Sequence, residues 1–307
     1  MPVRHNPQPL FRDLFTPEAV AARGGRPAAG MFLSSGDPTT AEICAGAGLD
    51  YLLIDAEHAP LTLQDVLAQL RTIAGYRVPT LVRVPALDTV AIKQFLDLGA
   101  QTLLVPMVDD AAMARSAVAA ARYPDGSAEG GVRGVGSALA RSGRWNRIPG
   151  YLPGAADHVS VIVQIETAAG VRNADEIAAV DGIDGVFIGP SDLSASLGLL
   201  GQQSHPDVVA AVEEVITKVK AAGKIVGVNA FVPAQADAYA AAGADYVNVG
   251  ADVALLARAA EALADRWCPA PSDAAGDGRA RPARRTDLVI PSLRGAKSTP
   301  WTSDPGP

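Results

Sequence analysis

Eight short runs of aliphatic and β-branched residues alternate with alanine-rich helical stretches between residues 28 and 266. The expected strands are residues 28–33, 51–54, 80–84, 102–106, 159–165, 185–188, 225–230 and 246–249. Strands that alternate with helices pair in parallel, because each helix returns the chain to the same end of the sheet. Eight such units predict an α/β protein with a closed (β/α)8 TIM barrel. An open doubly wound sheet is the alternative, but no glycine-rich dinucleotide fingerprint follows the first expected strand.

The composition agrees with such a barrel and argues against other classes of protein. Hydrophobic residues make up 49% of the chain and aromatic residues only 5%, so we expect a core built mainly from Val, Leu, Ile and Ala. The net charge of −7 argues against a nucleic-acid partner. Two cysteines are too few for a disulfide framework, and no apolar run reaches membrane-spanning length. With no recognisable signal peptide, a cytoplasmic location without a membrane partner is the expectation.

The chain divides into three expected segments. Residues 1–27 form an N-terminal arm, residues 28–268 the barrel, and residues 269–307 a tail rich in Pro, Gly, Ser and Arg. We expect the tail to be disordered, because it has little apolar surface to bury. Within the barrel, the connection formed by residues 123–154 is unusually long and carries four arginines: Arg133, Arg141, Arg144 and Arg147. Long structured loops are usually functional, so the connection is interpreted as a substrate lid or, alternatively, as an arginine-rich subunit contact.

Polar side chains gather where the expected strands end. They are Asp55, Glu57 and His58 after the second strand, Arg83 at the third, Gln164 and Glu166 at the fifth, Gly189, Ser191 and Asp192 after the sixth, and Asn229 at the seventh. The catalytic groups of a barrel cluster at the carboxyl ends of its strands. Five such ends together therefore predict one site.

Two of these residues are candidate metal ligands. Glu166 and Asp192 follow neighbouring strands, so their carboxylates can converge. Two hard oxygen ligands, with room for water and a chelating substrate, suit Mg²⁺, Mn²⁺ or Co²⁺ better than Zn²⁺. Gln164 lies two residues before Glu166 and therefore on the same strand face. The alternative is that the two acids pair with Arg83 or cap helices.

The remaining charged residues suggest how a reaction would proceed. His58 is the only one of the four histidines at a strand's carboxyl end, where a proton shuttle would lie, although a structural role is the alternative. Arg83 is a planar cation suited to a carboxylate or an enolate oxygen; the alternative is a salt bridge to Asp55 or Glu57. None of the five lysines lies at a carboxyl end, which disfavours a Schiff-base mechanism.

Five stretches of the sequence together resemble the HpcH/HpaI family of class II pyruvate aldolases. They are residues 55–60 (DAEHAP), 103–108 (LLVPMV), 133–141 (RGVGSALAR), 163–167 (VQIET) and 185–194 (GVFIGPSDLS). They occur in order, and the resemblance covers about residues 28–267. Residues 144–149 (RWNRIP) are similar to the 4-hydroxy-2-oxoheptanedioate aldolase branch in particular.

The resemblance implies roles for the residues at the strand ends. Glu166 and Asp192 would hold the metal, and His58 would act as acid and base. Substrate would be bound by Arg83 and Gln164, by Gly189, and by backbone amides around Ser191 and Asp192. Asp55 and Glu57 would hold the metal-binding and substrate-binding side chains in position.

The resemblance also gives Asp97 a catalytic role, in which it orients the histidine. Asp97 lies near the C-terminal end of its expected helix, which points to the opposite face of the barrel. It would therefore act across a subunit contact, or it is structural. Two departures from the family pattern, at Ala56 and Ser191 and in residues 123–131, could change the acceptor aldehyde.

The expected function is cleavage of 4-hydroxy-2-keto acids, such as 4-hydroxy-2-oxoheptanedioate from aromatic catabolism, to pyruvate and an aldehyde. The reaction would need a divalent metal and no organic cofactor. The resemblance implies a homohexamer, a trimer of dimers that exchange the last helix, residues 253–266. Alternatives are a 2-keto-3-deoxy sugar acid aldolase, a citrate-lyase-like enzyme acting on CoA thioesters, and a non-catalytic binding protein.

Overall fold

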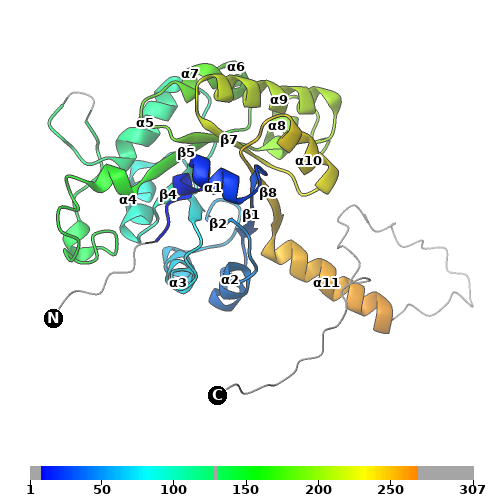
Figure 1. The fold of residues 1–307 in the computed structure, drawn as a ribbon, viewed down its shortest axis with the longest axis horizontal. Coiled ribbons are helices and arrows are strands. Elements are labelled where there is room, and N and C mark those ends of the chain that lie inside the picture. Colours follow the sequence, from blue (N-terminus) through cyan, green and yellow to red (C-terminus); the bar gives the residue numbers. More distant parts are fainter. Residues whose placement is uncertain (1–7, 128–129, 269–307) are drawn as a thin grey trace, which may run out of the picture. The chain divides into compact units, whose positions relative to one another are not determined.

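The computed structural model describes residues 8–127 and 130–268, and within them eight parallel strands close into a barrel (Figure 1). The strands are β1 (Ala28–Leu33), β2 (Tyr51–Asp55), β3 (Thr80–Arg83), β4 (Thr102–Val105), β5 (Ser160–Ile165), β6 (Gly185–Ile188), β7 (Ile225–Asn229) and β8 (Tyr246–Ala251). Each strand pairs with the next in sequence, and β8 pairs with β1. The predicted barrel is confirmed, and each strand ends within two residues of its expected position.

Helices precede, connect and follow the strands, and those that connect strands cover the outside of the barrel (Figure 1). They are α1 (Pro17–Ala22), α2 (Pro38–Ala45), α3 (Leu63–Ile73), α4 (Thr89–Asp97), α5 (Ala111–Ala121), α6 (Ala168–Arg172), α7 (Ala174–Ala178), α8 (Pro190–Ser196), α9 (Pro206–Ala221), α10 (Pro233–Ala241) and α11 (Asp252–Trp267), with 3-10 turns η1 (Phe11–Phe15), η2 (Ser137–Leu139) and η3 (Ala155–His158). Helices α3, α4 and α5 begin where the side chains of Thr62, Asp88 and Asp110 accept backbone N–H groups of the first turn. Such caps satisfy donors that a helix start leaves unpaired.

The core has two parts of different composition. Between the strands and the outer helices the buried side chains are almost all aliphatic, as the composition predicts. The inside of the barrel is rich in aromatic rings instead: Phe11, Phe32, Tyr51, Phe187 and Tyr246 are all buried there. The few aromatic residues of the chain are therefore concentrated where the barrel needs the largest volume filled.

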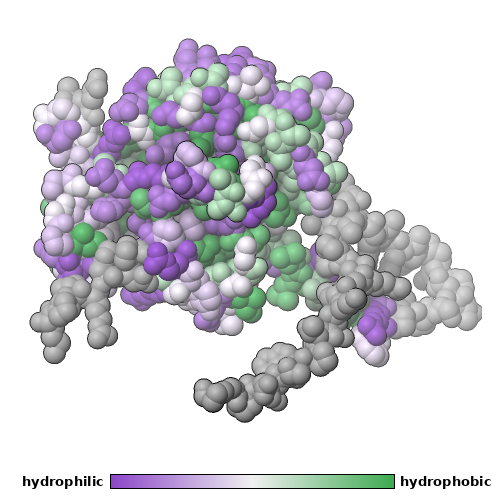
Figure 2. All heavy atoms as spheres, viewed as in Figure 1, coloured by the Kyte–Doolittle hydropathy of each residue, from purple (hydrophilic) through white to green (hydrophobic). Residues whose placement is uncertain are grey.

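The segment before β1 closes the amino end of the barrel. Phe11, in η1, is 1% exposed and packs edge-on against the rings of Tyr51 and Tyr246, at 5.3 and 5.1 Å between ring centroids. Helix α1 follows and lies across the same end (Figure 1). The surface on this side is mostly hydrophilic, with apolar side chains between the polar ones (Figure 2). The described part of the arm therefore packs as part of the barrel and closes its amino end.

Two glycines make room for the tyrosine rings inside the barrel. A Cβ atom at Gly30 would lie 2.4 Å from the ring of Tyr51, and one at Gly227 would lie 2.2 Å from the ring of Tyr246. Both tyrosines are fully buried, and the Tyr246 hydroxyl donates a hydrogen bond to the Val186 carbonyl at 2.9 Å. The rings therefore have no free space to move into.

We expect Gly227→Ala to destabilise the barrel, because the added methyl group overlaps a ring that cannot shift. Overpacking of this kind costs about 1–3 kcal/mol. Gly250→Ala is the matched control, since an added Cβ there meets nothing within 4 Å. The measurement is chemical denaturation of both variants beside the parent chain. Equal midpoints for the two variants would contradict this account of Gly227.

A short motif, Gly-X-Asp, stands directly before three of the strands, and the sequence analysis did not find it. In each case the glycine has a positive φ, which favours glycine, and the aspartate side chain accepts a backbone N–H from the preceding strand. The hydrogen bonds run from Ala29 to Asp50 before β2 (2.8 Å), from Val161 to Asp184 before β6 (2.7 Å) and from Val226 to Asp245 before β8 (2.9 Å). These bonds join the starts of neighbouring strands.

The carboxyl end of β8 is tied to that of β1 by Asp252. Its carboxylate accepts the backbone N–H groups of Ser34 at 2.8 Å and of Ser35 at 3.1 Å. Asp252 also begins α11, which runs from the first compact unit, residues 1–255, into the second, residues 256–307. The expected disorder of residues 269–307 lies outside the described residues. No helix in the described part of the chain has the length and apolar character needed to cross a membrane.

Candidate active site

The structure brings most of the polar residues predicted at strand ends to one mouth of the barrel. Asp55 and Arg83 are the last residues of β2 and β3, and Glu166 directly follows β5. Gly189 and Asp192 follow β6, the first before α8 and the second inside it. Because the strands are parallel, all of these positions share the carboxyl end of the barrel.

Arg83 is held by two carboxylates. Its Nε donates to Asp55 Oδ1 at 2.9 Å, its Nη2 lies 2.8 Å from Asp55 Oδ2, and its Nη1 lies 3.0 Å from Glu57 Oε2. The guanidinium also lies over the ring of Phe32, with Cζ 4.8 Å from the ring centroid. The salt bridges given as the alternative for Arg83 are therefore present. They fix the plane of the cation and do not by themselves exclude a role in binding.

Asp55 organises the turn that carries His58. Besides Arg83, its Oδ1 accepts the backbone N–H groups of Glu57 at 3.1 Å and His58 at 3.3 Å. The His58 side chain is 64% exposed, and its Nε2 lies 3.6 Å from Glu57 Oε2. An imidazole that is open to solvent on one side and faces a carboxylate on the other has the placement that a proton shuttle needs.

Glu166 is the most deeply buried acid of the mouth. It is 2% exposed, its Oε1 accepts the Met107 backbone N–H at 2.9 Å, and its Oε2 accepts Gln164 Nε2. Met107 reaches this position with a φ of 56°, in the left-handed region that is unfavourable for a residue with a side chain. A Cβ at Gly189 would lie 2.6 Å from Glu166 Oε2, so glycine is required there. The local backbone is thus shaped around this carboxylate.

Like charges crowd the mouth. Burial raises the pKa of Glu166 to about 7 against the hydrogen bonds from Gln164 and Met107, and the charges of Glu57 and Asp192 act in the same direction as burial. Burial also raises the pKa of Glu57, opposed by the charges of Arg83 and His58. A bound cation would reduce the repulsion between these carboxylates.

The residues at the mouth fit a cation that keeps open coordination positions. In the described residues no group of three or more His, Cys, Asp or Glu side chains is arranged to hold a metal. Two carboxylates, Glu166 and Asp192, would therefore leave most ligand positions to water and substrate, as Mg²⁺ sites usually do. The Oε1 atom of Gln164 is buried and has no hydrogen-bond partner among the described residues, so it remains available to a ligand.

Asn229, another of the predicted strand-end residues, ends β7 on the same side of the barrel. Its Oδ1 is 3.5 Å from Asn248 Nδ2, and the buried Oδ1 of Asn248 has no partner in the described part of the chain. The sequence analysis missed Asn248, together with Phe32 and Met107. Asn248 lies within a strand, and Phe32 and Met107 are hydrophobic. None of the three is a polar residue at a strand end, which was the feature used to predict the site.

Asp97 is not brought to His58 within one chain. It is the last residue of α4, and its Oδ1 pairs with Nη2 of Arg133 at 2.8 Å. Arg133 comes from the long loop, is fully buried, and stacks on the ring of Tyr123, with Cζ 4.4 Å from the centroid. The loop therefore packs against the C-terminal end of α4, where helices return the chain to the amino ends of the strands. The described part of the loop therefore does not form a lid over the mouth.

Comparison with known proteins gives consistent matches over most of the chain. A family model described as HpcH/HpaI aldolase/citrate lyase matches residues 28–259. A hydroxypyruvate/pyruvate aldolase of Deinococcus radiodurans is 54% identical over 84% of this chain and 92% of its own length. A 4-hydroxy-2-oxo-heptane-1,7-dioate aldolase of Salmonella dublin is 54% identical over 80% of this chain and 92% of its own. The crystal structure of an HpcH/HpaI aldolase/citrate lyase family protein from Burkholderia cenocepacia J2315 is 42% identical, with a TM-score of 0.74 over 78% of this chain and 94% of that one.

Proposed function

Because the chain belongs to the HpcH/HpaI aldolase/citrate lyase family, and is an aldolase of the carbon–carbon lyase class, we propose that it cleaves 4-hydroxy-2-keto acids to pyruvate and an aldehyde. One observation carries the proposal: buried Glu166, repelled by Glu57 and Asp192, stands at the same barrel mouth as a fixed Arg83. A cation and an anionic keto acid together complement these charges.

Glu166 and Asp192 would hold a divalent metal, Mg²⁺, Mn²⁺ or Co²⁺. When bound, such an ion polarises carbonyl oxygens and stabilises negative charge. The family's chemistry supports a divalent ion in general, and the choice among the three is part of this proposal. Gln164 Oε1, which lacks a partner among the described residues, would accept a hydrogen bond from the hydroxyl group of the substrate, and backbone N–H groups around Gly189 and Ser191 would donate to its carboxylate.

Arg83 and His58 would act at different steps of the reaction. A base removes the proton of the C4 hydroxyl, and the C3–C4 bond breaks as the aldehyde C=O forms. The electron pair left on the pyruvate half carries negative charge, and the guanidinium of Arg83, already oriented by Asp55, would lie against that charge. Groups fixed in advance stabilise a transition state because they need no reorganisation. His58 would deliver the proton to C3 from the solvent side, with Glu57 near its Nε2.

The choice of substrate rests on the relatives. A 4-hydroxy-2-oxo-heptane-1,7-dioate aldolase and a hydroxypyruvate/pyruvate aldolase are equally similar to this chain. The RWNRIP stretch, which resembles the first branch, favours 4-hydroxy-2-oxoheptanedioate as substrate. Hydroxypyruvate is the second candidate, as the nucleophile in the condensation direction.

The test is release of pyruvate from 4-hydroxy-2-oxoheptanedioate by the full chain, with added Mg²⁺ or Mn²⁺ and after treatment with EDTA. We expect steady turnover with metal and a loss of nearly all activity after chelation that added metal restores. Activity that survives exhaustive chelation would refute the metal role. Activity on a citryl or other CoA thioester alone would favour the citrate-lyase-like alternative. No turnover of any of these substrates would leave a binding protein.

We also propose a homohexamer, a trimer of dimers. Helix α11 has apolar residues three or four positions apart, such as Leu256, Ala260 and Leu263, which suit packing against another chain. In such an assembly Asp97 would orient a histidine across a subunit contact. Light scattering of the full chain at micromolar concentration tests this, and a mass of 31.5 kDa would exclude it.

A further inference from the structure

The Gly-X-Asp motif that precedes β2, β6 and β8 recurs before β4 with one change. Gly99 has the same positive φ as the other three glycines, but Gln101 stands in the place of the aspartate. Two of the three aspartates pair with a basic side chain: Arg26 lies 2.5 Å from Asp50, and Lys220 lies 2.6 Å from Asp245. At β4 the carboxylate is missing.

The basic side chain is nevertheless present at β4. Arg141 lies so close to Gly99 that a Cβ there would be 2.5 Å from its Nη1. Among the described residues, its guanidinium donates only to the backbone carbonyls of Leu98, at 3.1 Å, and Leu70, at 3.3 Å. Within the described residues no carboxylate lies within 4.0 Å of it. A half-buried guanidinium bound only to neutral carbonyls keeps an uncompensated positive charge.

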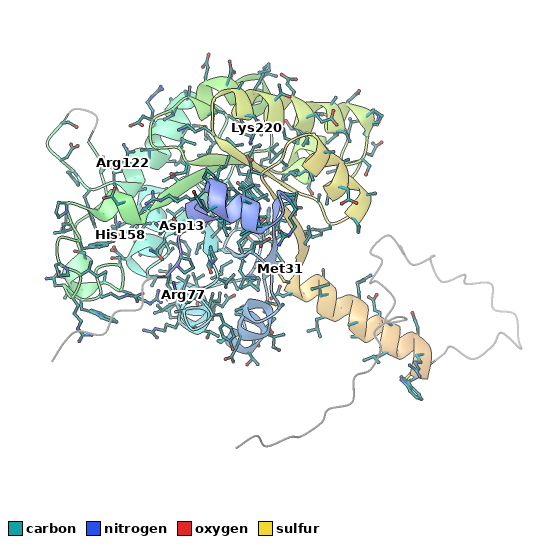
Figure 3. All side chains as sticks on the ribbon, in the orientation of Figure 1. Asp13, Met31, Arg77, Arg122, His158 and Lys220 are labelled. Carbon is teal, nitrogen blue, oxygen red and sulfur yellow. The ribbon has the colours of Figure 1, made fainter. Side chains whose placement is uncertain are left out.

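A cavity of about 250 Å³ opens beside Arg141, at the amino end of the barrel and so at the opposite end from the active site. Gln101 and Val159, which directly precede β4 and β5, mark its position. The cavity is also lined by Arg144, Ser142, Ile148 and Leu10. Asp13 and His158, both labelled in Figure 3, also line the cavity. We call this the amino-end cavity.

Two polar side chains in the amino-end cavity lack partners among the described residues. Among the described residues, the guanidinium of Arg144 makes no hydrogen bond or ion pair, and the buried Oγ of Ser142 has no hydrogen-bond partner. Burial, together with the charges of Arg144 and Arg71, lowers the pKa of Arg141 to about 10. Asp13, the one acid that lines the cavity, accepts the Leu10 backbone N–H at 3.0 Å and pairs with neither arginine.

The backbone that presents Arg144 is unfavourable for residues with side chains. Arg144, Trp145 and Asn146 have φ values of 48°, 56° and 61°, three consecutive residues in the left-handed region. Only glycine and, less readily, asparagine adopt this conformation at low cost. Such strain persists where the surrounding structure fixes it, often at ligand sites.

We propose that the amino-end cavity is a second ligand site, separate from the active site, that binds a small organic dicarboxylate. One carboxylate of the ligand pairs with Arg141, which has no carboxylate partner among the described residues. The other carboxylate is bound by Arg144 and Ser142. The apolar side chains of Leu10, Ile148 and Val159 cover the carbon chain between them, which favours an organic dianion over inorganic phosphate.

The test is calorimetric titration of the full chain with succinate, in the presence of saturating Mg²⁺ and pyruvate so that the active site is occupied. Arg144→Asn removes the charge with a residue that tolerates the positive φ, and we expect it to weaken succinate binding at least about tenfold. Gln101→Asp restores the motif's own carboxylate beside Arg141, and it should weaken binding to a similar extent. Arg147→Asn is the control, because Arg147 lies over the ring of Trp145, outside the cavity, and should leave binding unchanged.

Four results would overturn the proposal. Absence of saturable succinate binding would remove the site. An equal loss in Arg147→Asn would indicate attraction by general charge. Phosphate binding as tight as succinate binding would indicate an inorganic anion. A smaller particle mass for Arg144→Asn in light scattering would show that these arginines bind another subunit. None of these results depends on which keto acid the active site cleaves.

Discussion

Glu166→Gln is expected to reduce metal-dependent cleavage by about 10³-fold, while the folded state is retained. A metal acting as Lewis acid contributes several kcal/mol to the transition state, and about 1.4 kcal/mol corresponds to a tenfold change in rate. Glutamine keeps the shape of the side chain and can still accept the Met107 N–H through its amide oxygen. Asp192→Asn should act in the same direction, and less strongly if water replaces its ligand oxygen.

The measurement is kcat with Mg²⁺ varied to saturation, together with metal affinity by calorimetry. Glu176→Gln is the matched control, because Glu176 lies on α7 and is exposed, so its loss should leave both quantities unchanged. A Glu166→Gln variant that binds metal and turns over like the parent would show that Glu166 is not a ligand. Its burial and raised pKa would then need another explanation.

His58→Ala is expected to keep its affinity for metal but to lose proton exchange at the pyruvate methyl group by about 10²–10⁴-fold, the usual contribution of a positioned acid or base. The side chain is 64% exposed, and Glu57 is its one charged partner in the described part of the chain, so its removal does not open a cavity. The measurement is loss of the methyl proton signal in D₂O with metal saturating.

Two variants separate this result from a general loss of function. His205→Asn keeps the capping acceptor at the start of α9 and should exchange protons at the parent rate. Arg83→Lys keeps the charge but loses the planar fork that Asp55 and Glu57 bind, so it should weaken pyruvate binding as well as exchange. Parent-like exchange in His58→Ala would assign proton transfer to water or another residue and leave His58 a structural role.

The barrel and much of its mouth could be predicted because they depend on local patterns. Alternating strands and helices fix the topology, and parallel strands then place Asp55, Arg83, Glu166 and Asp192 at the same end. The pairing of Arg83 with both Asp55 and Glu57 could be named only as an alternative, because the sequence does not show whether a turn folds back far enough for two carboxylates to meet one cation.

Features that depend on contacts far apart in the sequence could not be predicted. Phe11 closes the barrel only because its ring meets the rings of Tyr51 and Tyr246 from distant strands, and Gly227 is required only because a ring from another strand lies against it. The run of left-handed residues that begins at Arg144 contains no glycine, so its composition gave no sign of its conformation.

The closure of the barrel makes folding dependent on both ends of the chain. Phe11 meets Tyr246, and Ser34 meets Asp252, across more than two hundred residues of sequence. Contacts at such separation form late, because a long loop must close before they contribute. During synthesis, β1 has no partner on its free edge until β8 has left the ribosome. The nascent chain therefore passes through a stage with an open sheet and exposed aromatic rings, the stage at which aggregation and chaperone binding are favoured.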